Sequence, residues 1–189
     1  MSGPRVQPLA APDGAVAALD AGVVAPLAEL SVFRVLLRHP RLARSFQELL
    51  LSMLVSPRIA PRLRELVIMR IGWCSGSVYE WTQHWSIARD VGVPEADLLA
   101  LRGDWQSHPG FGPADRAVLA ATDEVLATGG VRDSTWAACE AALAGPAERI
   151  ELVCAIGTWR MIATVLETLR VPLEDGVDPW PPDGRGPEA

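Results

Sequence analysis

Hydrophobic residues recur every three or four positions along most of the chain, a spacing typical of amphipathic α-helices. Prolines near the starts of these segments and glycines just past their ends mark helix boundaries. No segment alternates cleanly between apolar and polar residues. The pattern predicts an all-α fold of roughly six to eight helices in a single domain. The expected helices cover 28–38, 40–54, 61–73, 77–91, 94–102, 113–128, 134–144 and 146–170.

The two ends of the chain depart from this pattern. The first residues contain few large apolar side chains, and the end contains the run Asp178-Pro-Trp-Pro-Pro-Asp-Gly-Arg-Gly-Pro187. Segments of this composition bury too little apolar surface to fold alone. We therefore expect a flexible N-terminal arm over 1–20, a helical domain over 21–175 and a flexible C-terminal tail over 176–189.

The last predicted helix is apolar on nearly all sides, so it needs neighbours all around it. In a domain of this size it can reach a subunit interface, and we expect a homo-oligomer. Its apolar stretch, Leu152 to Leu166, is too short to span a bilayer comfortably. It also carries Arg160 near its middle, where a charge is costly in lipid. A buried helix and no membrane partner are expected.

Charge and cysteine content narrow the possible functions. The formal net charge is −6, so the phosphate backbone of a nucleic acid would be repelled. The three cysteines are an odd number without the spacing of a disulfide framework. The N-terminal sequence has no apolar run of a signal peptide. These features predict a reduced, cytoplasmic protein that does not bind nucleic acid.

The first candidate catalytic residue is Glu65, which lies on an apolar arc of the helix predicted over 61–73. A carboxylate there is either paired with a donor or has its pKa raised by desolvation. A raised pKa would suit a general acid or base near neutral pH. The structural alternative ties Glu65 to Arg62 or to the N-terminus of the next helix, and for Glu65 alone we favour it.

Three polar residues, Ser77, Glu80 and His84, follow at helical spacing and share one face of the next helix. The short loop between the two helices allows Glu65 to approach them. A capping box is the alternative for Ser77 and Glu80, in which each side chain accepts the backbone N–H of the other residue. For Ser77 we favour the cap.

His84 also has a structural alternative, as a hydrogen-bonded core histidine between Trp81 and Trp85. A zinc site would need further ligands of suitable type. The other histidines, His39 and His108, lie beside prolines in unrelated segments. We therefore expect no metal.

The whole stretch resembles the carboxymuconolactone decarboxylase and alkylhydroperoxidase D-like superfamily, and within it the decarboxylase-type branch. The resemblance covers roughly residues 28–175. It implies an AhpD-like helical bundle, a trimer or hexamer, and no organic cofactor. The motifs that carry it are Arg64-Glu65-Leu-Val-Ile-Met-Arg70, Tyr79-Glu80-Trp81 with Gln83-His84, Ile87-Ala88-Arg89 with Gly92-Val-Pro-Glu-Ala-Asp97, Phe33-Arg34 with His39-Pro40, Asp133-Ser-Thr-Trp136 and Val171-Pro-Leu-Glu174.

In the peroxidase branch of this superfamily, two cysteines fall where this chain has Ser77 and Glu80. The residues that help activate the thiol match Glu65 and His84. Disulfide-cycling peroxide reduction is therefore not expected. Cys74 lies out of register at the end of a helix, where the pKa of a thiol is raised. A peroxidase-like oxidoreductase that uses Cys74 stays open as an alternative.

The resemblance implies proton transfer on a small carbonyl, lactone or carboxylate compound, either decarboxylation or isomerisation. His84 is the expected acid and base, with Glu80 or Glu65 as its partner. Tyr79 is a candidate donor to a developing oxyanion, although its phenol could simply cap a helix. A non-enzymatic member whose pocket binds a ligand or serves as a scaffold is a further alternative.

Substrate binding is assigned to Ser77, Trp81 and Arg160. The tryptophans at 73, 81 and 85 allow an aromatic-walled pocket that would include Trp81, with simple core packing as the alternative for most of them. Arg160 departs from the family pattern, and a buried arginine needs a carboxylate partner. That partner could be Glu65, Glu80 or an acid of another subunit, or it could be a substrate carboxylate held by two hydrogen bonds. We favour a structural pairing.

Overall fold

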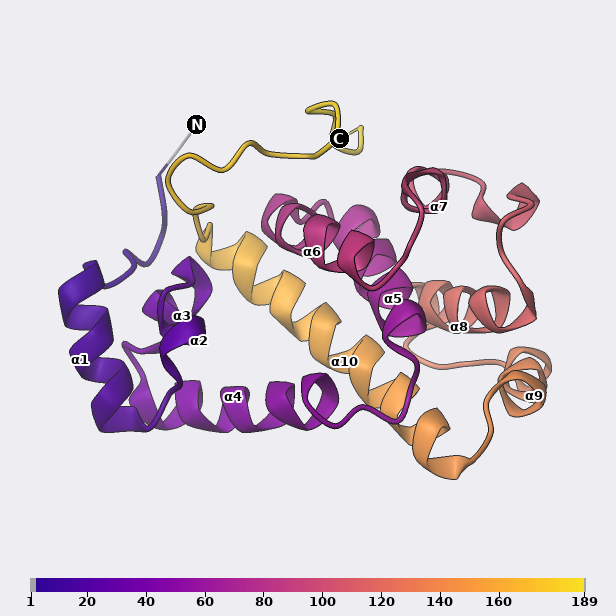
Figure 1. The fold of residues 1–189 in the computed structure, drawn as a ribbon, viewed down its shortest axis with the longest axis horizontal. Coiled ribbons are helices and arrows are strands. Elements are labelled where there is room, and N and C mark those ends of the chain that lie inside the picture. The colour runs from indigo at the N-terminus through magenta and orange to yellow at the C-terminus, as the bar shows by residue number, and fades with distance from the viewer. Residues whose placement is uncertain (1–2, 189) are drawn as a thin grey trace. The chain divides into compact units, whose positions relative to one another are not determined.

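The structure, a computed structural model, describes residues 3–188 (Figure 1). Within that range it contains ten α-helices and one short 3-10 helix, and no strand. The all-α prediction is confirmed, and the helices are more numerous than expected. The contacts group the chain into two compact units. One contains the residues up to 56 together with 165–177, and the other contains 57–164 together with the residues from 178 onward.

The first unit contains α1 (Ala11–Ala21), which the sequence analysis missed. The predicted N-terminal arm is helical from Ala11. The prediction failed because α1 buries small residues, Gly14 and Ala18 among them, rather than large apolar side chains. The helix ends at Gly22, which has a left-handed backbone (φ 72°) and donates back to the Ala18 and Leu19 carbonyls.

The rest of this unit is α2 (Ala25–Ala28), α3 (Ser31–Leu36) and α4 (Pro40–Leu54). The single helix predicted over 28–38 is divided because Leu30 is extended. The bounds of α4 agree with the prediction. His39 caps α4, since its Nδ1 accepts the Leu42 N–H at 3.3 Å. His39, which we did not expect to bind a metal, therefore serves as a helix cap.

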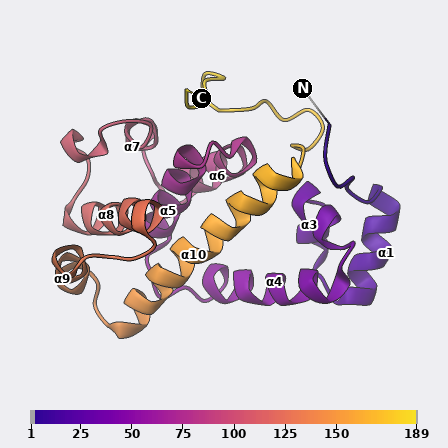
Figure 2. The same cartoon turned by 180° about the vertical axis from the view of Figure 1, so that it is seen from behind.

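The second unit is built on α5 (Pro61–Cys74) and α6 (Val78–Asp90), which pack against each other (Figure 2). Gly72 permits their close approach, because a Cβ there would lie 3.1 Å from the backbone nitrogen of Trp81. The next elements are α7 (Glu95–Ala100), the 3-10 helix (Trp105–Ser107), α8 (Pro113–Thr128) and α9 (Asp133–Ala142). Of these, α8 packs against α5 and α9.

The longest helix, α10 (Pro146–Leu169), buries Leu152, Ile156 and Trp159 completely or nearly so. The sequence predicts neighbours on every side of this helix, a subunit interface included, and in the single chain one face is exposed, with Val153 at 45% and Met161 at 42%. Among the described residues, α10 alone has the length and apolar composition to cross a membrane. The core helix of a soluble protein passes the same test, and 44% of the most apolar window of α10 is buried.

Candidate functional site

The packing of α5 against α6 brings Glu65 and His84 into direct contact. The Nδ1 of His84 lies 2.8 Å from the Oε2 of Glu65. Glu65 is completely buried, whereas 17% of the His84 side chain is exposed. The other carboxylate oxygen accepts a hydrogen bond from the Nε of Arg64 at 3.0 Å. Glu65 is therefore paired, but with these two residues rather than with Arg62.

Burial disfavours the charged form of Glu65 and by itself would raise the pKa of this carboxyl. The charges and hydrogen bonds of His84 and Arg64 outweigh burial, so the pKa of Glu65 is lowered below its ordinary value. Glu65 is thus a carboxylate at neutral pH and not the general acid that a raised pKa would allow. With Glu65 ionised, Nδ1 of His84 carries the hydrogen of this contact, so Nε2 is the ring nitrogen that Glu65 does not engage.

The ring of His84 is held on a second side by Trp159 of α10. The two rings meet edge to face, with centroids 6.1 Å apart and planes at 83°. Trp159 is almost fully buried. The histidine is therefore fixed by a carboxylate at one nitrogen and by an aromatic wall, while part of the ring stays accessible.

Ser77 and Glu80 are both buried, at 0% and 2% exposure, near the start of α6. The predicted capping box is wrong, because the Ser77 side chain makes no capping hydrogen bond. The backbone N–H of Ser77, which the box would pair with Glu80, donates instead to the Gly72 carbonyl at 2.9 Å. The Ser77 Oγ has no hydrogen-bond partner among the described residues. A buried hydroxyl in that state costs about 1–3 kcal/mol.

The two aromatic residues assigned to the site are both buried, with Tyr79 at 4% and Trp81 at 0% exposure. The indole N–H of Trp81 donates to the Pro181 carbonyl at 2.8 Å. Its ring lies 5.1 Å from that of Trp73 and 6.4 Å from that of Trp180. Trp81 thus belongs to an aromatic cluster with the C-terminal segment, and not to an open aromatic wall.

Arg160 is not the buried cation that we expected. It is exposed, and its Nη1 donates to the Val125 backbone carbonyl at 3.0 Å. The reason is helical geometry, because Arg160 lies two turns beyond the exposed Val153 and shares its face of α10. The structure does not bring it to Glu65 or Glu80 by any contact among the described residues.

Cys74 is the last residue of α5, and the residue is exposed when all of its atoms are counted together. Desolvation of its sulfur by the surrounding protein raises the pKa of the thiol, Arg70 opposes this shift, and Asp123 adds to it. A raised pKa keeps the thiol protonated and unreactive at neutral pH. The direction agrees with our expectation for a bystander thiol.

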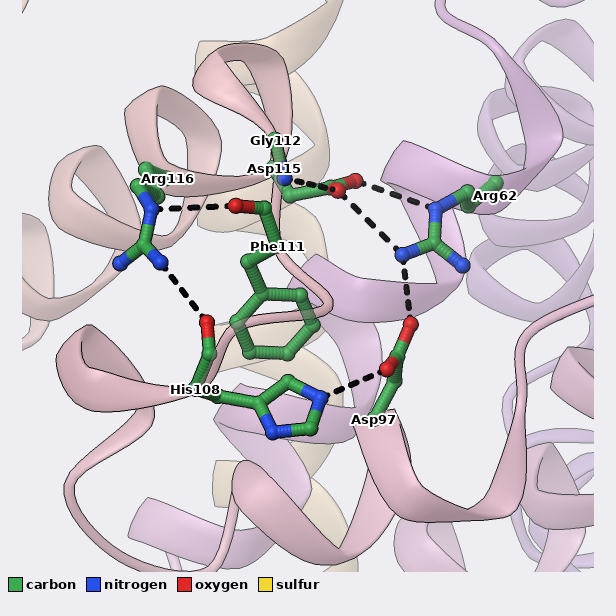
Figure 3. Close-up of polar contacts among 7 residues, drawn as sticks. All are labelled: Arg62, Asp97, His108, Phe111, Gly112, Asp115 and Arg116. Carbon is green, nitrogen blue, oxygen red and sulfur yellow. Dashed lines mark hydrogen bonds and ion pairs between the residues drawn. The ribbon is translucent and has the colours of Figure 1, made fainter.

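A second histidine–carboxylate contact, between His108 and Asp97, was not predicted (Figure 3). The Nε2 of His108 lies 2.7 Å from Asp97 Oδ1, and Arg62 Nη2 lies 2.7 Å from Asp97 Oδ2. Arg62 also binds Asp115, which accepts the Gly112 N–H at 3.0 Å. Burial opposes ionisation of Asp97, but Arg62 and His108 lower the pKa of its carboxyl. The network fastens the loop between α7 and α8.

No group of three or more His, Cys, Asp or Glu side chains among the described residues could hold a metal ion.

Comparison with known proteins supports the resemblance noted in the sequence. The sequence model of the carboxymuconolactone decarboxylase family matches residues 40–124, which include Glu65, Ser77, Glu80 and His84. No functionally curated protein matches the sequence.

Solved structures share the fold at low sequence identity. The debrominase Bmp8 in complex with 2,3,4-tribromopyrrole is 17% identical, with a TM-score of 0.70, over 90% of this chain and 91% of that one. An alkylhydroperoxidase AhpD core protein from Ralstonia eutropha JMP134 is 16% identical, with a TM-score of 0.68, over 87% and 84% of the two chains. A protein of unknown function from Agrobacterium tumefaciens, proposed to be the antioxidant defence protein AhpD, is 19% identical, with a TM-score of 0.67, over 74% and 94%.

Proposed function

We propose that this chain is a cofactor-independent acid–base enzyme of the carboxymuconolactone decarboxylase and alkylhydroperoxidase D-like superfamily, which the match of the family's sequence model to residues 40–124 supports. It acts on a small carbonyl, lactone or carboxylate compound by decarboxylation or isomerisation. The observation that carries this proposal is the buried contact of 2.8 Å between Glu65 and His84. By the resemblance to the peroxidase branch, this pair corresponds to the residues that activate the thiol there, and this chain has Ser77 and Glu80 at the two thiol positions.

In this mechanism Nε2 of His84 moves the proton. For isomerisation, it removes a proton from a carbon next to a carbonyl, and the C–H electron pair becomes that of an enolate. The imidazolium then returns the proton to a different carbon. For decarboxylation, the electrons of the broken C–C bond form the enolate as carbon dioxide leaves, and a protonated His84 supplies the proton. Glu65 stabilises the imidazolium in both cases.

The buried hydroxyl of Ser77 and the phenol of Tyr79 are the candidate donors to the enolate oxygen. A donor that is already oriented inside the protein stabilises a developing oxyanion far better than water does. The Ser77 Oγ supports this role, because it is buried without a hydrogen-bond partner among the described residues. Glu80, two per cent exposed on the same helix, is the second candidate proton carrier.

The test is a screen of carbonyl, lactone, carboxylate and hydroperoxide compounds against wild type and His84→Ala. A brominated pyrrole belongs in the screen, because the debrominase Bmp8 has the same fold. We expect turnover of a carbonyl or lactone compound that His84→Ala abolishes. Turnover that survives both His84→Ala and Glu80→Gln would overturn the proposal.

The screen also separates this proposal from a peroxidase-like enzyme that uses Cys74. Alkylation of the thiols should stop peroxide consumption by such an enzyme and leave acid–base turnover unchanged. The raised pKa of Cys74 argues against the peroxidase.

We further propose that the protein is a cytoplasmic homo-oligomer, a trimer or hexamer, assembled through the exposed apolar face of α10. This face contains Ile150 at 64%, Val153 at 45% and Met161 at 42% exposure. Exposed apolar side chains on one face of a helix favour a protein partner. Val153→Arg should then lower the mass measured by light scattering, whereas Arg132→Ala, at an exposed position just before α9, should not.

A further inference from the structure

A cavity of about 500 Å³ lies in the first compact unit, where α2 packs against α1 and α3 (Figure 1). Sites for small molecules usually have volumes of roughly 300–1,000 Å³ and mainly apolar walls with a few polar groups. This cavity has that composition, because its described lining consists of alanines with Leu19 and Val23, and of two charged residues, Glu29 and Arg34. Its size and its lining are those of a site for a small ligand.

The cavity exists because the helices around it present methyl groups where larger side chains would fill the space. Ala11, Ala15 and Ala18 follow one another along one face of α1 and line the cavity. Ala18, Val23 and Ala28 are buried and form its floor. An apolar ligand that covers these side chains removes their remaining surface from water, which favours binding in proportion to the area covered.

Arg34, a residue of α3, supplies a cation whose position is fixed by the protein. Its Nε donates to the Leu9 carbonyl at 2.6 Å. Its stem lies against Gly14, where a Cβ would be 3.3 Å from the Arg34 Cγ. The side chain is partly buried, and Nη1 and Nη2 have no hydrogen-bond partner among the described residues. Two guanidinium nitrogens of this kind can bind both oxygens of a carboxylate at once.

Glu29, the other charged residue of the lining, is exposed, and no ion pair joins it to Arg34 among the described residues. Water screens an exposed charge strongly, so the repulsion between Glu29 and a bound anion is weak. The partly buried guanidinium is screened less and its Nε is already held in place. The charge that this cavity favours in a ligand is therefore negative.

From this arrangement we infer that the cavity binds a small apolar carboxylate, an aliphatic or aromatic acid. The carboxylate of the ligand binds Nη1 and Nη2 of Arg34, and its apolar part covers the alanines of α1 and α2. The inference is independent of the proposed acid–base activity, because none of the residues that line the cavity takes part in proton transfer. It also gives a role to Arg34, which the proposed function does not use.

The first experiment titrates the full-length protein with octanoate and follows the alanine methyl resonances by NMR. The methyl groups of Ala15 and Ala25, which line the cavity, should shift saturably. Octanamide and octylamine have the same chain without the negative charge, and each should bind at least about tenfold more weakly. Arg34→Gln should weaken octanoate binding by about ten- to a hundredfold. Glu29→Gln is the matched control and should leave octanoate affinity unchanged or slightly higher.

A second experiment fills the cavity. Ala15→Phe places a ring in it and should abolish octanoate binding, whereas Val16→Phe should not, because Val16 is exposed at the next position of α1 and outside the lining. Arg34→Lys keeps the charge but not the paired nitrogens, so its affinity should lie between those of wild type and Arg34→Gln. His84→Ala should bind octanoate as wild type does, which separates this cavity from the site of proton transfer.

Circular dichroism checks that each variant is folded, and the comparison of octanoate with octanamide on wild type needs no variant. Equal binding of these two compounds, or octanoate binding that survives Ala15→Phe, would overturn the inference. So would a preference for octylamine that Glu29→Gln removes, because the ligand would then be a cation. Leu19→Arg should leave the mass measured by light scattering unchanged, and a lower mass would mean that a second copy covers the cavity instead.

Discussion

Glu65 and Asp97 are both buried carboxylates, and each contacts one arginine and one histidine at similar distances. Glu65 binds Arg64 at 3.0 Å and His84 at 2.8 Å. Asp97 binds Arg62 at 2.7 Å and the second histidine, His108, also at 2.7 Å. Their pKa values are lowered for the same reasons, with burial opposed by a guanidinium and an imidazole. Contact geometry alone does not distinguish the two.

The difference lies in what else surrounds each pair. Asp97 and His108 belong to a network that fastens a loop, and the ring of His108 lies 4.8 Å from that of Phe111. The backbone there is crowded, since a Cβ at Gly110 would be 2.6 Å from Asp97 Oδ1. Near Glu65, in contrast, Ser77 is buried at the start of α6, and its Oγ has no hydrogen-bond partner among the described residues. We therefore take a histidine–carboxylate pair to indicate catalysis only where a nearby polar group, such as the Ser77 hydroxyl, is not already used by the protein.

The largest expected difference between the two pairs is the effect of removing each histidine. We expect His84→Ala to reduce kcat for an identified substrate by about 10²- to 10⁴-fold, the usual contribution of a general acid or base. His108→Ala is the matched control and should leave kcat within about twofold, since it lies outside the proton-transfer site. Equal losses of kcat in the two variants would mean that both pairs affect activity only by stabilising the fold.

Glu65→Gln should be the more destabilising of two carboxylate substitutions. It removes the charge between Arg64 and His84 in a fully buried position. Breaking a buried ion pair costs about 3–5 kcal/mol. Urea unfolding followed by circular dichroism would measure the loss, and a change below about 1 kcal/mol would contradict a tightly coupled pair.

Asp97→Asn should destabilise the protein by about 1–3 kcal/mol, because one charged hydrogen-bonding group is lost from a partly exposed network. Arg62 is 29% exposed there, so water replaces part of the lost interaction. The same variant should retain kcat. Loss of activity at full stability would assign the Asp97 network to the functional site.

Acid should weaken both pairs. A carboxyl whose pKa is lower in the folded than in the unfolded state stabilises the protein above its unfolded pKa, and this contribution is lost as the pH falls. For Glu65 and Asp97 the ordinary values are 4.5 and 3.8. Unfolding free energy should therefore decrease as the pH falls below these values, less steeply in Glu65→Gln than in wild type.

The smallest expected effect on stability is that of Ser77→Ala, which tests whether the unpartnered hydroxyl distinguishes the Glu65 site from the Asp97 network. Ser77→Ala removes a buried hydroxyl that has no partner among the described residues, so stability should stay unchanged or rise by up to about 1 kcal/mol. Activity should fall if the hydroxyl serves the enolate oxygen. Chemical denaturation and kcat measured on the same sample would test both effects, and a large loss of stability would show that Ser77 is structural.

The sequence predicted those parts of the fold that depend on helical periodicity. The bounds of α4 and α8 agree with the prediction, α5 ends one residue later than predicted, and α6 is one residue shorter than predicted at each end. Helix α1 was missed because it packs through alanine and glycine, which give little amphipathic signal. The C-terminal segment was expected to be mobile because composition does not reveal that the Trp180 ring packs edge to face against that of Trp73.

The candidate site was partly predictable for a similar reason. Glu65 and His84 lie on adjacent helices joined by a short loop, so their approach follows from local spacing. The contact between Asp97 and His108 depends on how a loop folds back, which no periodicity encodes. The capping box failed because the Ser77 N–H donates to the Gly72 carbonyl in the turn that ends α5, where Gly76 has a left-handed backbone (φ 65°).

Gly72 has a further consequence, because it lies two turns after Glu65 on α5 and its missing side chain faces α6. A methyl group there would lie 3.1 Å from the Trp81 nitrogen, so the helices would have to part by a few tenths of an ångström to admit it. His84 is one turn beyond Trp81, and its hydrogen bond to Glu65 would lengthen in step. The absence of a side chain at position 72 thus sets the distance between Glu65, seven residues before it, and His84, twelve residues after it.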